Sequence, residues 1–312
     1  MADGGHAIRA ENLSRHFGHV KAVDELSLEV REGEIFGLVG PDGAGKTTTI
    51  RLLAGILSVT AGAAWVTGRN VLSEAEAIKP DIGYVSQTFS LYPDLTVIEN
   101  LQFYADIYGV SRRDRIRQFE QLLAITSLEP FRQRPAGQLS GGMKQKLSLC
   151  CALLHSPRVL LLDEPTNGVD PLSRREFWRI LSRLSRDKVT VFIATAYLHE
   201  AERCSRVGFL HQGRLLATGT PNELKGLVQG IILEFDTPDP RRAVAILRQH
   251  PAVLHASRLG TRVHLTVTVT DSAREIADFM AKHDVPMTGI HLIPPSLEDV
   301  FVSMLSDPLP DA

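Results

Sequence analysis

The stretch "GPDGAGKTT", residues 40–48, decides the fold of this chain. It follows a short apolar run at 34–39 and precedes an amphipathic pattern at 45–57, the context in which G-x-x-x-x-G-K-[ST] forms a phosphate loop. The glycines let the backbone bend, so that successive N–H groups and the start of the helix face a polyphosphate. The stretch therefore predicts phosphate binding at the end of a buried strand.

Two side chains of this loop carry chemistry. Lys46 should reach the β- and γ-phosphates of a nucleotide as a point charge, and the Thr47 hydroxyl should bind Mg²⁺. A glycine turn next to a surface lysine is the alternative, which the flanking strand and helix disfavour. The predicted nucleotide-binding residues of the loop are Gly40, Pro41, Asp42, Gly43, Ala44, Gly45, Lys46, Thr47 and Thr48.

The stretch "VLLLDEP", residues 159–165, ends another buried strand with two adjacent carboxylates. Neighbouring strand residues point to opposite sides, but the end of a strand can turn both toward one site. Asp163 is then placed to hold Mg²⁺ through water, and Glu164 to orient or deprotonate an attacking water. Two acidic residues that cap the turn at Pro165 are the alternative, which the phosphate loop makes weaker.

A second helix start lies at "LSGGMKQKL", residues 139–147. Ser140, Gly141 and Gly142 come immediately before a helical pattern, and a serine cap with exposed amides can bind an anion. A simple helix cap is the commoner case. The two predicted anion-binding helix starts need not bind the same anion within one molecule. The second can therefore bind a phosphate held by a partner chain.

The bulk composition describes an ordinary globular protein. A chain of 312 residues exceeds the usual size of a single core, so two domains are expected. The net charge of −2 gives no general attraction to nucleic acid or anionic lipid. We find no apolar run near the roughly 20 residues of a membrane span and no apolar signal core in "MADGGHAIRA", so we expect no membrane insertion.

Short apolar runs separated by helical patterns indicate a parallel sheet covered on both faces. Alternating patterns at 7–13 and 22–30 predict an antiparallel subsheet, and 206–219 predicts a hairpin that turns at Gln212 and Gly213. The buried strands are expected at 34–39, 159–163 and 189–194, and the helices at 45–57, 97–108, 113–125, 141–154 and 172–185.

Residues 229–306 predict a second, small domain of accessory or regulatory role, since no catalytic constellation is found in it. The predicted order is βαββαβ, a ferredoxin-like unit. A last helix from about Ser296 to Leu305 precedes a tail at 307–312, which we expect to be disordered. The elements are expected at 231–236, 239–249, 253–258, 262–269, 271–282 and 287–293.

The order of these motifs resembles that of ABC transporter ATPase subunits. The phosphate loop, Gln87 in "IGYVSQ", the signature "LSGGMKQ", the acidic "LLLDEP" and "GVDP" (168–171) follow in the family's order, over residues 6 to about 225. The resemblance implies an α/β P-loop ABC-type ATPase domain at 1–228. That domain would have a parallel core sheet, an antiparallel β subdomain and a helical subdomain at about 88–155, with the α+β ferredoxin-like domain after it.

The end of the chain and three motifs resemble exporter ATPases in particular within this family. "IPPSLEDVFVSML" (293–305) resembles the ending of drug- and polysaccharide-exporter ATPases in this family. "GPDGAGKTT", "LSGGMKQKL" and "YLHEAERC" are most similar to the first head of YbhF-type two-headed exporter ATPases.

The resemblance also implies roles for single residues. Phe17 would stack on adenine, where the family usually has Tyr; a small core contact is the alternative. Gln87 would touch Mg²⁺ and the attacking water and sense the membrane partner. Ser140 with Gly142 would clamp the γ-phosphate held by the opposite subunit, and Asp170 would contact that subunit. The predicted catalytic residues are Lys46, Gln87 and Glu164, and the predicted metal-binding residues are Thr47, Gln87 and Asp163.

Aromatic residues between 87 and 109 fall where the family docks its transmembrane partner. Most are expected in the core at helical spacing, whereas Phe89 and Tyr92 are expected to be exposed. The five are Phe89, Tyr92, Phe103, Tyr104 and Tyr108.

One position departs from the family's pattern. The family ends the strand in "TVFIATAYLHEAERC" (190–204) with Thr-His, whose imidazole reaches the γ-phosphate and helps position Glu164. Here Ala196 has neither donor nor acceptor. Losing one such donor costs on the order of 10² to 10³ in rate, whereas binding need not suffer. His199, one turn further on, could substitute, but the family has an exposed acidic residue there.

We therefore expect an ATP-binding subunit of an export-type transporter that binds MgATP and hydrolyses it, slowly if Ala196 impairs its site. The expected partners are a transmembrane permease subunit and a second ATPase head, with no nucleic acid, at the cytoplasmic face of the membrane. The second head makes a hetero- or homodimer. A site without the histidine beside an intact signature and Asp170 favours the heterodimer, because a homodimer would carry the defect twice. The alternatives are a non-hydrolytic regulatory ATP-binding head, favoured by Ala196 and opposed by Glu164, and a soluble ABC protein of DNA repair or translation.

Overall fold

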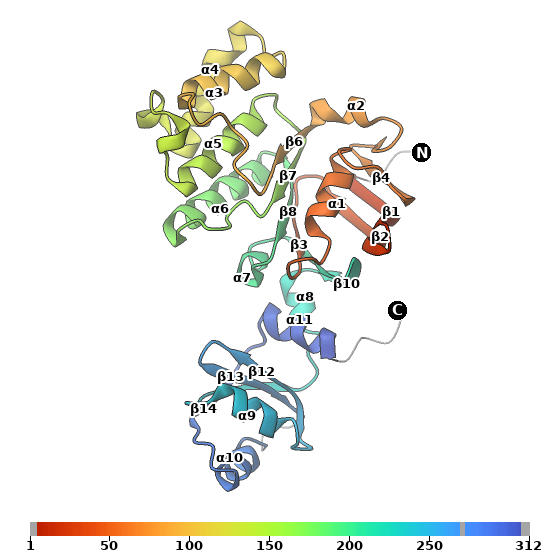
Figure 1. Ribbon diagram of the computed structural model, residues 1–312, viewed down its shortest axis with the longest axis vertical. Coiled ribbons are helices and arrows are strands. Elements are labelled where there is room, and N and C mark those ends of the chain that lie inside the picture. Colours follow the sequence, from red (N-terminus) through yellow and green to blue (C-terminus); the bar gives the residue numbers. More distant parts are fainter. Residues whose placement is uncertain (1–4, 269–271, 307–312) are drawn as a thin grey trace. The chain divides into compact units, whose positions relative to one another are not determined.

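The computed structural model describes residues 5–268 and 272–306 (Figure 1). Contacts divide the chain into two compact units, Met1–Thr218 and Gly219–Ala312. The short helix α8 (Pro221–Lys225) therefore groups with the second unit, whereas the sequence prediction assigned residues up to 228 to the first. None of the helices in the described ranges combines the length and apolar character that crossing a bilayer requires.

A six-stranded sheet in the order β10-β9-β3-β8-β7-β6 organises the first unit. The pairs β9-β3, β3-β8, β8-β7 and β7-β6 are parallel. Strands β3, β7 and β8 are buried along their whole length, which explains their non-alternating sequences. The strands are β3 (Ile35–Val39), β6 (Ile82–Val85), β7 (Val159–Asp163), β8 (Thr190–Thr195), β9 (Arg206–His211) and β10 (Arg214–Gly219).

Helices cover both faces of this sheet (Figure 1). Helix α1 (Lys46–Leu53) lies on one face, and α5 (Gly141–Leu153) and α6 (Pro171–Arg186) lie on the other. Helix α1 ends before the predicted residue 57, because Gly55 takes a φ of 67° directly after the C-cap. Two shorter helices are α2 (Ala75–Ile78) and α7 (Leu198–Ala201).

A four-stranded antiparallel subsheet packs beside α1, in the order β2-β1-β4-β5. Its side chains share one apolar core with α1 and one face of the main sheet. The antiparallel subsheet predicted at 7–13 and 22–30 corresponds to β1 and β2, and β4 and β5 extend it. The strands are β1 (His6–Phe17), β2 (Val20–Arg31), β4 (Ala61–Val66) and β5 (Arg69–Asn70).

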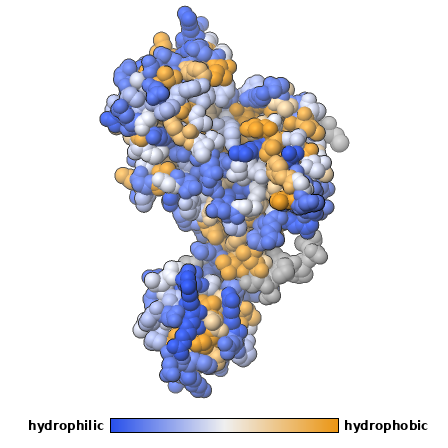
Figure 2. Space-filling model, viewed as in Figure 1, coloured by the Kyte–Doolittle hydropathy of each residue, from blue (hydrophilic) through white to orange (hydrophobic). Residues whose placement is uncertain are grey.

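A helical part follows β6 and consists of α3 (Val97–Ile107) and α4 (Arg112–Thr126), which share a core of their own with the middle and end of α5. The exposure of three of its aromatics, Phe89, Phe103 and Tyr108, differs from the sequence prediction, whereas Tyr92 is exposed as predicted. Phe89 is half-buried under the Lys144 ammonium, whereas Phe103 and Tyr108 are more than one third exposed, as is Tyr92. Figure 2 shows apolar atoms on this part at the top of the view.

The second unit has the predicted βαββαβ order and an antiparallel sheet, β12-β13-β11-β14. Helices α9 and α10 pack on the face that carries Leu233 and Phe235. The predicted tail at 307–312 and residues 269 and 271 of two predicted elements lie outside the described residues. The elements are β11 (Ile231–Asp236), α9 (Pro240–Leu247), β12 (Val253–Leu259), β13 (Arg262–Val267), α10 (Ser272–Lys282), β14 (Thr288–Ile293) and α11 (Leu297–Ser306).

A buried ionic cluster ties α11 to the other face of this sheet. The His264 imidazole, 5% exposed, lies 2.8 Å from Asp299 Oδ1 and 2.9 Å from Glu234 Oε2. The hydrogen bond with Asp299, and a weaker one with Glu234, raise the pKa of His264 against the effect of burial. The His264 side chain thus links β13, β11 and α11.

Candidate nucleotide-binding site

Glycine is required at two positions of the loop between β3 and α1. A Cβ at Gly40 would collide with the carbonyl oxygen of Leu210, and one at Gly45 with that of Ala22. Gly45 also has a φ of 108°, which side chains disfavour. The close approach of strands β9 and β2 therefore fixes the loop in a shape that only glycine permits.

The Lys46 ammonium lies inside this loop and is 4% exposed. It donates to the carbonyl oxygens of Gly40 at 2.8 Å and Pro41 at 3.0 Å, and it lies 3.2 Å from Glu164 Oε1. A buried charge with three oxygen partners is fully compensated without a ligand. The loop thus keeps a positive charge where the sequence predicts phosphates.

Asp163 and Thr47 meet at the end of β7. Thr47 Oγ1 donates to Asp163 Oδ1 at 2.9 Å, whereas Asp163 Oδ2 is buried without a hydrogen-bond partner. Burial raises the pKa of Asp163, and the neighbouring Glu164 charge adds to the effect, while the Thr47 bond opposes it. A divalent cation would satisfy the orphaned oxygen and favour the ionised carboxylate, so these residues fit Mg²⁺.

The described residues contain no group of three or more His, Cys, Asp or Glu side chains able to hold a metal ion. Mg²⁺ in nucleotide sites is commonly held by one or two protein oxygens together with phosphate oxygens and water. Thr47 and Asp163 therefore fit a cation that arrives with a nucleotide.

Glu164 occupies a constrained position directly after Asp163. Its φ is 47°, a left-handed value, and its amide donates to Ala194 O on β8 at 2.9 Å. Glu164 Oε2 accepts from Gln87 Nε2 at 3.1 Å and from Asn167 Nδ2 at 3.3 Å. The left-handed turn brings both carboxylates to one side, as the sequence prediction required.

One cleft of about 380 Å³ gathers the phosphate loop with Gln87 and Glu164. Sequence reasoning missed three of its lining residues, Val20, Lys21 and Ala22, which lie on β2. They belong to no motif, and only the approach of the subsheet brings them here. The predicted residues in the lining are Asp42, Gly43, Gly45, Lys46, Thr47, Thr48, Gln87 and Glu164.

Phe17 ends β1 beside this region. It is 46% exposed, pairs across the hairpin with Val20, and packs its ring 4.6 Å from the Arg15 guanidinium. Val20 lines the cleft but Phe17 does not. Its exposure argues against the core contact weighed as the alternative.

The signature residues and Asp170 start two helices outside the cleft lining. Ser140 caps α5 by accepting from Met143 N at 3.3 Å, and Asp170 caps α6 by accepting from Ser173 N at 2.9 Å. That backbone hydrogen bond from Ser173 is the main cause that lowers the pKa of Asp170. Gly142 packs against Ser173, where a Cβ would lie 2.6 Å from the hydroxyl oxygen. Both helix starts remain exposed at their capping residues.

The strand end at Ala196 is held by its neighbours. Thr195 Oγ1 donates to Glu200 Oε2 at 2.9 Å and accepts from Tyr197 N at 3.0 Å. The exposed His199 places Nε2 3.1 Å from an Arg174 guanidinium nitrogen on α6. His199 thus contacts α6 through Arg174.

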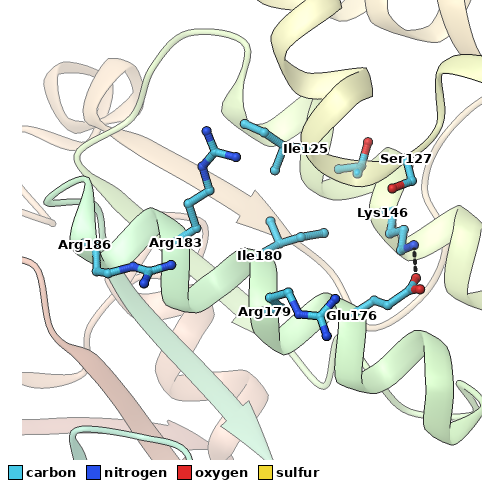
Figure 3. Close-up of a pocket in the computed structure, with 9 residues that line it drawn as sticks. Ile125, Ser127, Lys146, Glu176, Arg179, Ile180, Arg183 and Arg186 are labelled. Carbon is cyan, nitrogen blue, oxygen red and sulfur yellow. Dashed lines mark hydrogen bonds and ion pairs between the residues drawn. The ribbon is translucent and has the colours of Figure 1, made fainter.

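A second hollow, of about 320 Å³, lies between the end of α4 and helices α5 and α6 (Figure 3). Lys146 Nζ pairs with Glu176 at 2.5 Å, and the side chains of Arg179, Arg183 and Arg186 also line it. It shares no residue with the phosphate loop. The two hollows are therefore separate.

Two family models match the chain. The model described as "ABC transporter" matches residues 23–167, and the model described as "ATP-binding protein DrrA1-3-like, C-terminal domain" matches residues 219–305. Together they span the phosphate loop, both carboxylates and almost all of the second unit.

Curated relatives align with most of the chain. The probable multidrug ABC transporter ATP-binding protein YbhF of Escherichia coli is 41% identical over 245 residues, which are 78% of this chain and 42% of YbhF. The chain thus spans less than half the length of that relative. The daunorubicin resistance ATP-binding protein DrrA2 of Streptomyces coeruleorubidus is 36% identical, with 96% of this chain and 95% of DrrA2 covered.

Solved structures agree with the fold of the first unit. An ATP-binding subunit of an ABC transporter has a TM-score of 0.65 and 30% identity, with 70% of this chain and 92% of that chain covered. A dimeric ATP-binding cassette in a post-hydrolysis state bound to ADP and Pi has a TM-score of 0.62 and 26% identity, with 68% and 98% covered.

Proposed function

The chain belongs to the family of ABC transporter ATP-binding proteins, and we propose that it binds MgATP and hydrolyses it to drive a transmembrane permease in export. One observation carries the proposal. Lys46, Thr47 and Glu164 line one cleft, and Asp163 joins it through Thr47, although they come from segments 116 positions apart. Charge, metal ligands and a base thus converge on one place.

The loop residues bind the triphosphate in this proposal. The amides of 43–48 and the Lys46 ammonium face the β- and γ-phosphates, which displace the Gly40 and Pro41 carbonyls from that ammonium. Thr47 and Asp163 would hold Mg²⁺, which neutralises phosphate charge when bound. Phe17 offers an exposed ring to adenine from the neighbouring subsheet.

Glu164 acts as the base in the chemical step. It accepts a proton from the water whose oxygen attacks the γ-phosphorus, while the bond to the β–γ bridging oxygen breaks and ADP leaves. Gln87 donates to Glu164 Oε2 and so orients the carboxylate toward that water. Once the triphosphate occupies the loop, Lys46 exchanges Glu164 Oε1 for phosphate and frees that oxygen.

The signature residues and Asp170 are the proposed contacts with the second ATPase head. Ser140, Gly141 and Gly142 begin α5 outside the lining of the cleft, so we propose that they close on the nucleotide of a partner head. Because Ala196 weakens the chain's own site but not these residues, a heterodimer with a histidine-bearing head is the favoured assembly.

The exposed aromatics of the helical part are the proposed permease contact. Tyr92, Phe103 and Tyr108 form part of it, and Tyr92 packs edge-on against Phe103 with ring centroids 4.7 Å apart. Exposed aromatic clusters are typical of protein interfaces. The protein would then work at the cytoplasmic face of the membrane, with the second unit, predicted at 229–306, as an accessory domain.

The proposal is tested by MgATP titration calorimetry and by single-turnover hydrolysis, on the full chain alone and with candidate partner heads. We expect measurable affinity, slow hydrolysis alone and faster hydrolysis in the mixed dimer. Absence of MgATP affinity would overturn the proposal, and rapid hydrolysis by the lone chain would overturn the heterodimer. Rapid hydrolysis by this chain without a different head would instead favour a homodimer.

Ala196 favours one other function, a head that binds ATP without hydrolysing it. Glu164→Gln separates the two, because it removes the base but keeps the shape of the side chain. Under the leading proposal the variant loses the residual turnover; for a non-hydrolytic head it equals the native chain.

A further inference from the structure

Two residues outside the predicted site form a relay to the Glu164 carboxylate. Asn167 Nδ2 donates to Glu164 Oε2 at 3.3 Å, and the Tyr197 hydroxyl donates to Asn167 Oδ1 at 3.0 Å. An ionised carboxylate can only accept hydrogen bonds, so the amide must turn its NH₂ toward Glu164 and its oxygen toward Tyr197. The tyrosine thus selects the amide orientation that supports the carboxylate.

Tyr197 is itself fixed from two directions. Its amide donates to Thr195 Oγ1 at 3.0 Å, which ties it to the end of β8. The Arg174 guanidinium of α6 lies over its ring, 5.2 Å from the centroid, and Arg174 Nε lies 3.4 Å from the buried Glu200 Oε1. The ring is therefore held between the strand end and α6.

The relay reaches Glu164 beside the position that lacks a donor. Ala196 immediately precedes Tyr197, and its side chain cannot orient anything by hydrogen bonding. Asn167 and Gln87 donate to the same oxygen, Oε2, so the carboxylate has two amide donors that do not depend on residue 196.

We propose that Asn167 and Tyr197 are positioning residues that hold Glu164 for proton transfer and sustain the turnover that remains with alanine at 196. This inference rests on the proposed hydrolysis. Asn167 is exposed, so its hydrogen bonds compete with water, and the expected effect is moderate. A purely structural surface contact would instead change stability and leave the hydrolysis rate unchanged.

The test is a double-mutant cycle on the full chain in single-turnover hydrolysis at saturating MgATP. Tyr197→Phe should lower the rate about three- to tenfold and Asn167→Ala about tenfold, from the typical worth of a hydrogen bond to a charged group reduced for exposure. Because the residues act in series, the double variant should be no slower than Asn167→Ala alone. MgATP affinity and the melting temperature should not change in Tyr197→Phe.

Tyr104→Phe is the matched control, since it removes the same hydroxyl from the helical part and should leave the rate unchanged. Glu164→Gln in the same assay sets the rate that does not depend on the base. A native rate in Tyr197→Phe or additive losses in the double variant would overturn the relay, whereas a native chain no faster than Glu164→Gln would mean that the proposed hydrolysis itself is absent. Loss of MgATP affinity in the native chain would instead count against the proposed function.

Discussion

Replacing His264 by leucine should loosen α11 from the sheet of the second unit. The imidazole bridges Asp299 and Glu234, which are 6% and 8% exposed. Removing one partner of a buried ionic pair costs about 3–5 kcal/mol. Here Arg262 stays 2.9 Å from Glu234, and Ser296 N still donates to Asp299 at 2.9 Å, so about 2–3 kcal/mol is expected.

Hydrogen exchange followed by mass spectrometry measures this loss locally in the full chain. Both tryptophans, Trp65 and Trp178, lie in the first unit, so their fluorescence would not report it directly. Peptides from β11, β13 and α11 should lose about two orders of magnitude of protection, while those from β3 and β7 keep theirs.

The pH dependence of the same protection gives a second readout. The pKa of His264 is raised, so its contribution is complete below the ordinary histidine pKa of about 6.5 and is lost as the pH rises through the folded value. Burial raises the pKa of Glu234 and of Asp299, but the hydrogen bonds from His264, together with those from Arg262 to Glu234 and from Ser296 to Asp299, outweigh burial and lower both. The contributions of these carboxylates are therefore lost at acidic pH. Protection, corrected for intrinsic exchange, should fall as the pH rises through the raised pKa of His264, in the native chain but not in His264→Leu.

His291→Gln is the matched control for this prediction. His291 lies 3.3 Å from the same Glu234 carboxylate, but its side chain is 56% exposed, so its loss should cost less than about 0.5 kcal/mol. Equal effects of the two substitutions, or unchanged protection of α11 in His264→Leu, would refute the reasoning that the burial of His264 makes its contribution to stability large.

Three further substitutions probe the first unit. Lys46→Ala should weaken MgATP binding about ten- to a hundredfold in calorimetry, because a charge-assisted contact to phosphate is lost; unchanged affinity would contradict the phosphate loop. Ala196→His should raise single-turnover hydrolysis by up to about 10²-fold with unchanged affinity, and no gain would show that residue 196 does not limit the rate. Gly142→Ala should lower the free energy of unfolding by about 1–3 kcal/mol, because the Cβ meets Ser173, whereas Gly141→Ala should cost far less; equal melting temperatures would contradict the packing.

The hydrophobic periodicity of the sequence predicted strands correctly where the pattern of buried residues is typical of a strand. The buried runs of β3, β7 and β8 and the alternation in β1 and β2 correspond to strands. The strand β4, "AGAAWV", had no such signal, because alanine and glycine are poor strand formers. Its pairing with β1 determines it, and that pairing is a tertiary contact.

The sequence predicted those residues of the site that belong to motifs. Loop residues and carboxylates follow strand ends, and parallel strands end at one edge of a sheet, so their convergence follows from the sequence. Contacts made by side chains from other elements do not follow from the sequence. Lys21 reaches the cleft because β2 folds against α1, and Tyr197 reaches Asn167 because β8 lies beside β7.

The two neighbouring carboxylates are held by different partners, and this separates binding from turnover. Asp163 contacts Thr47 on α1, which also carries Lys46, so the proposed metal and phosphate contacts of these residues come from neither residue 196 nor the segment after β8. Glu164 depends on Gln87 and on the relay from Tyr197. Ala196 directly precedes Tyr197, which belongs to the second set, and the proposed head that binds MgATP firmly but turns over slowly is physically consistent with this arrangement.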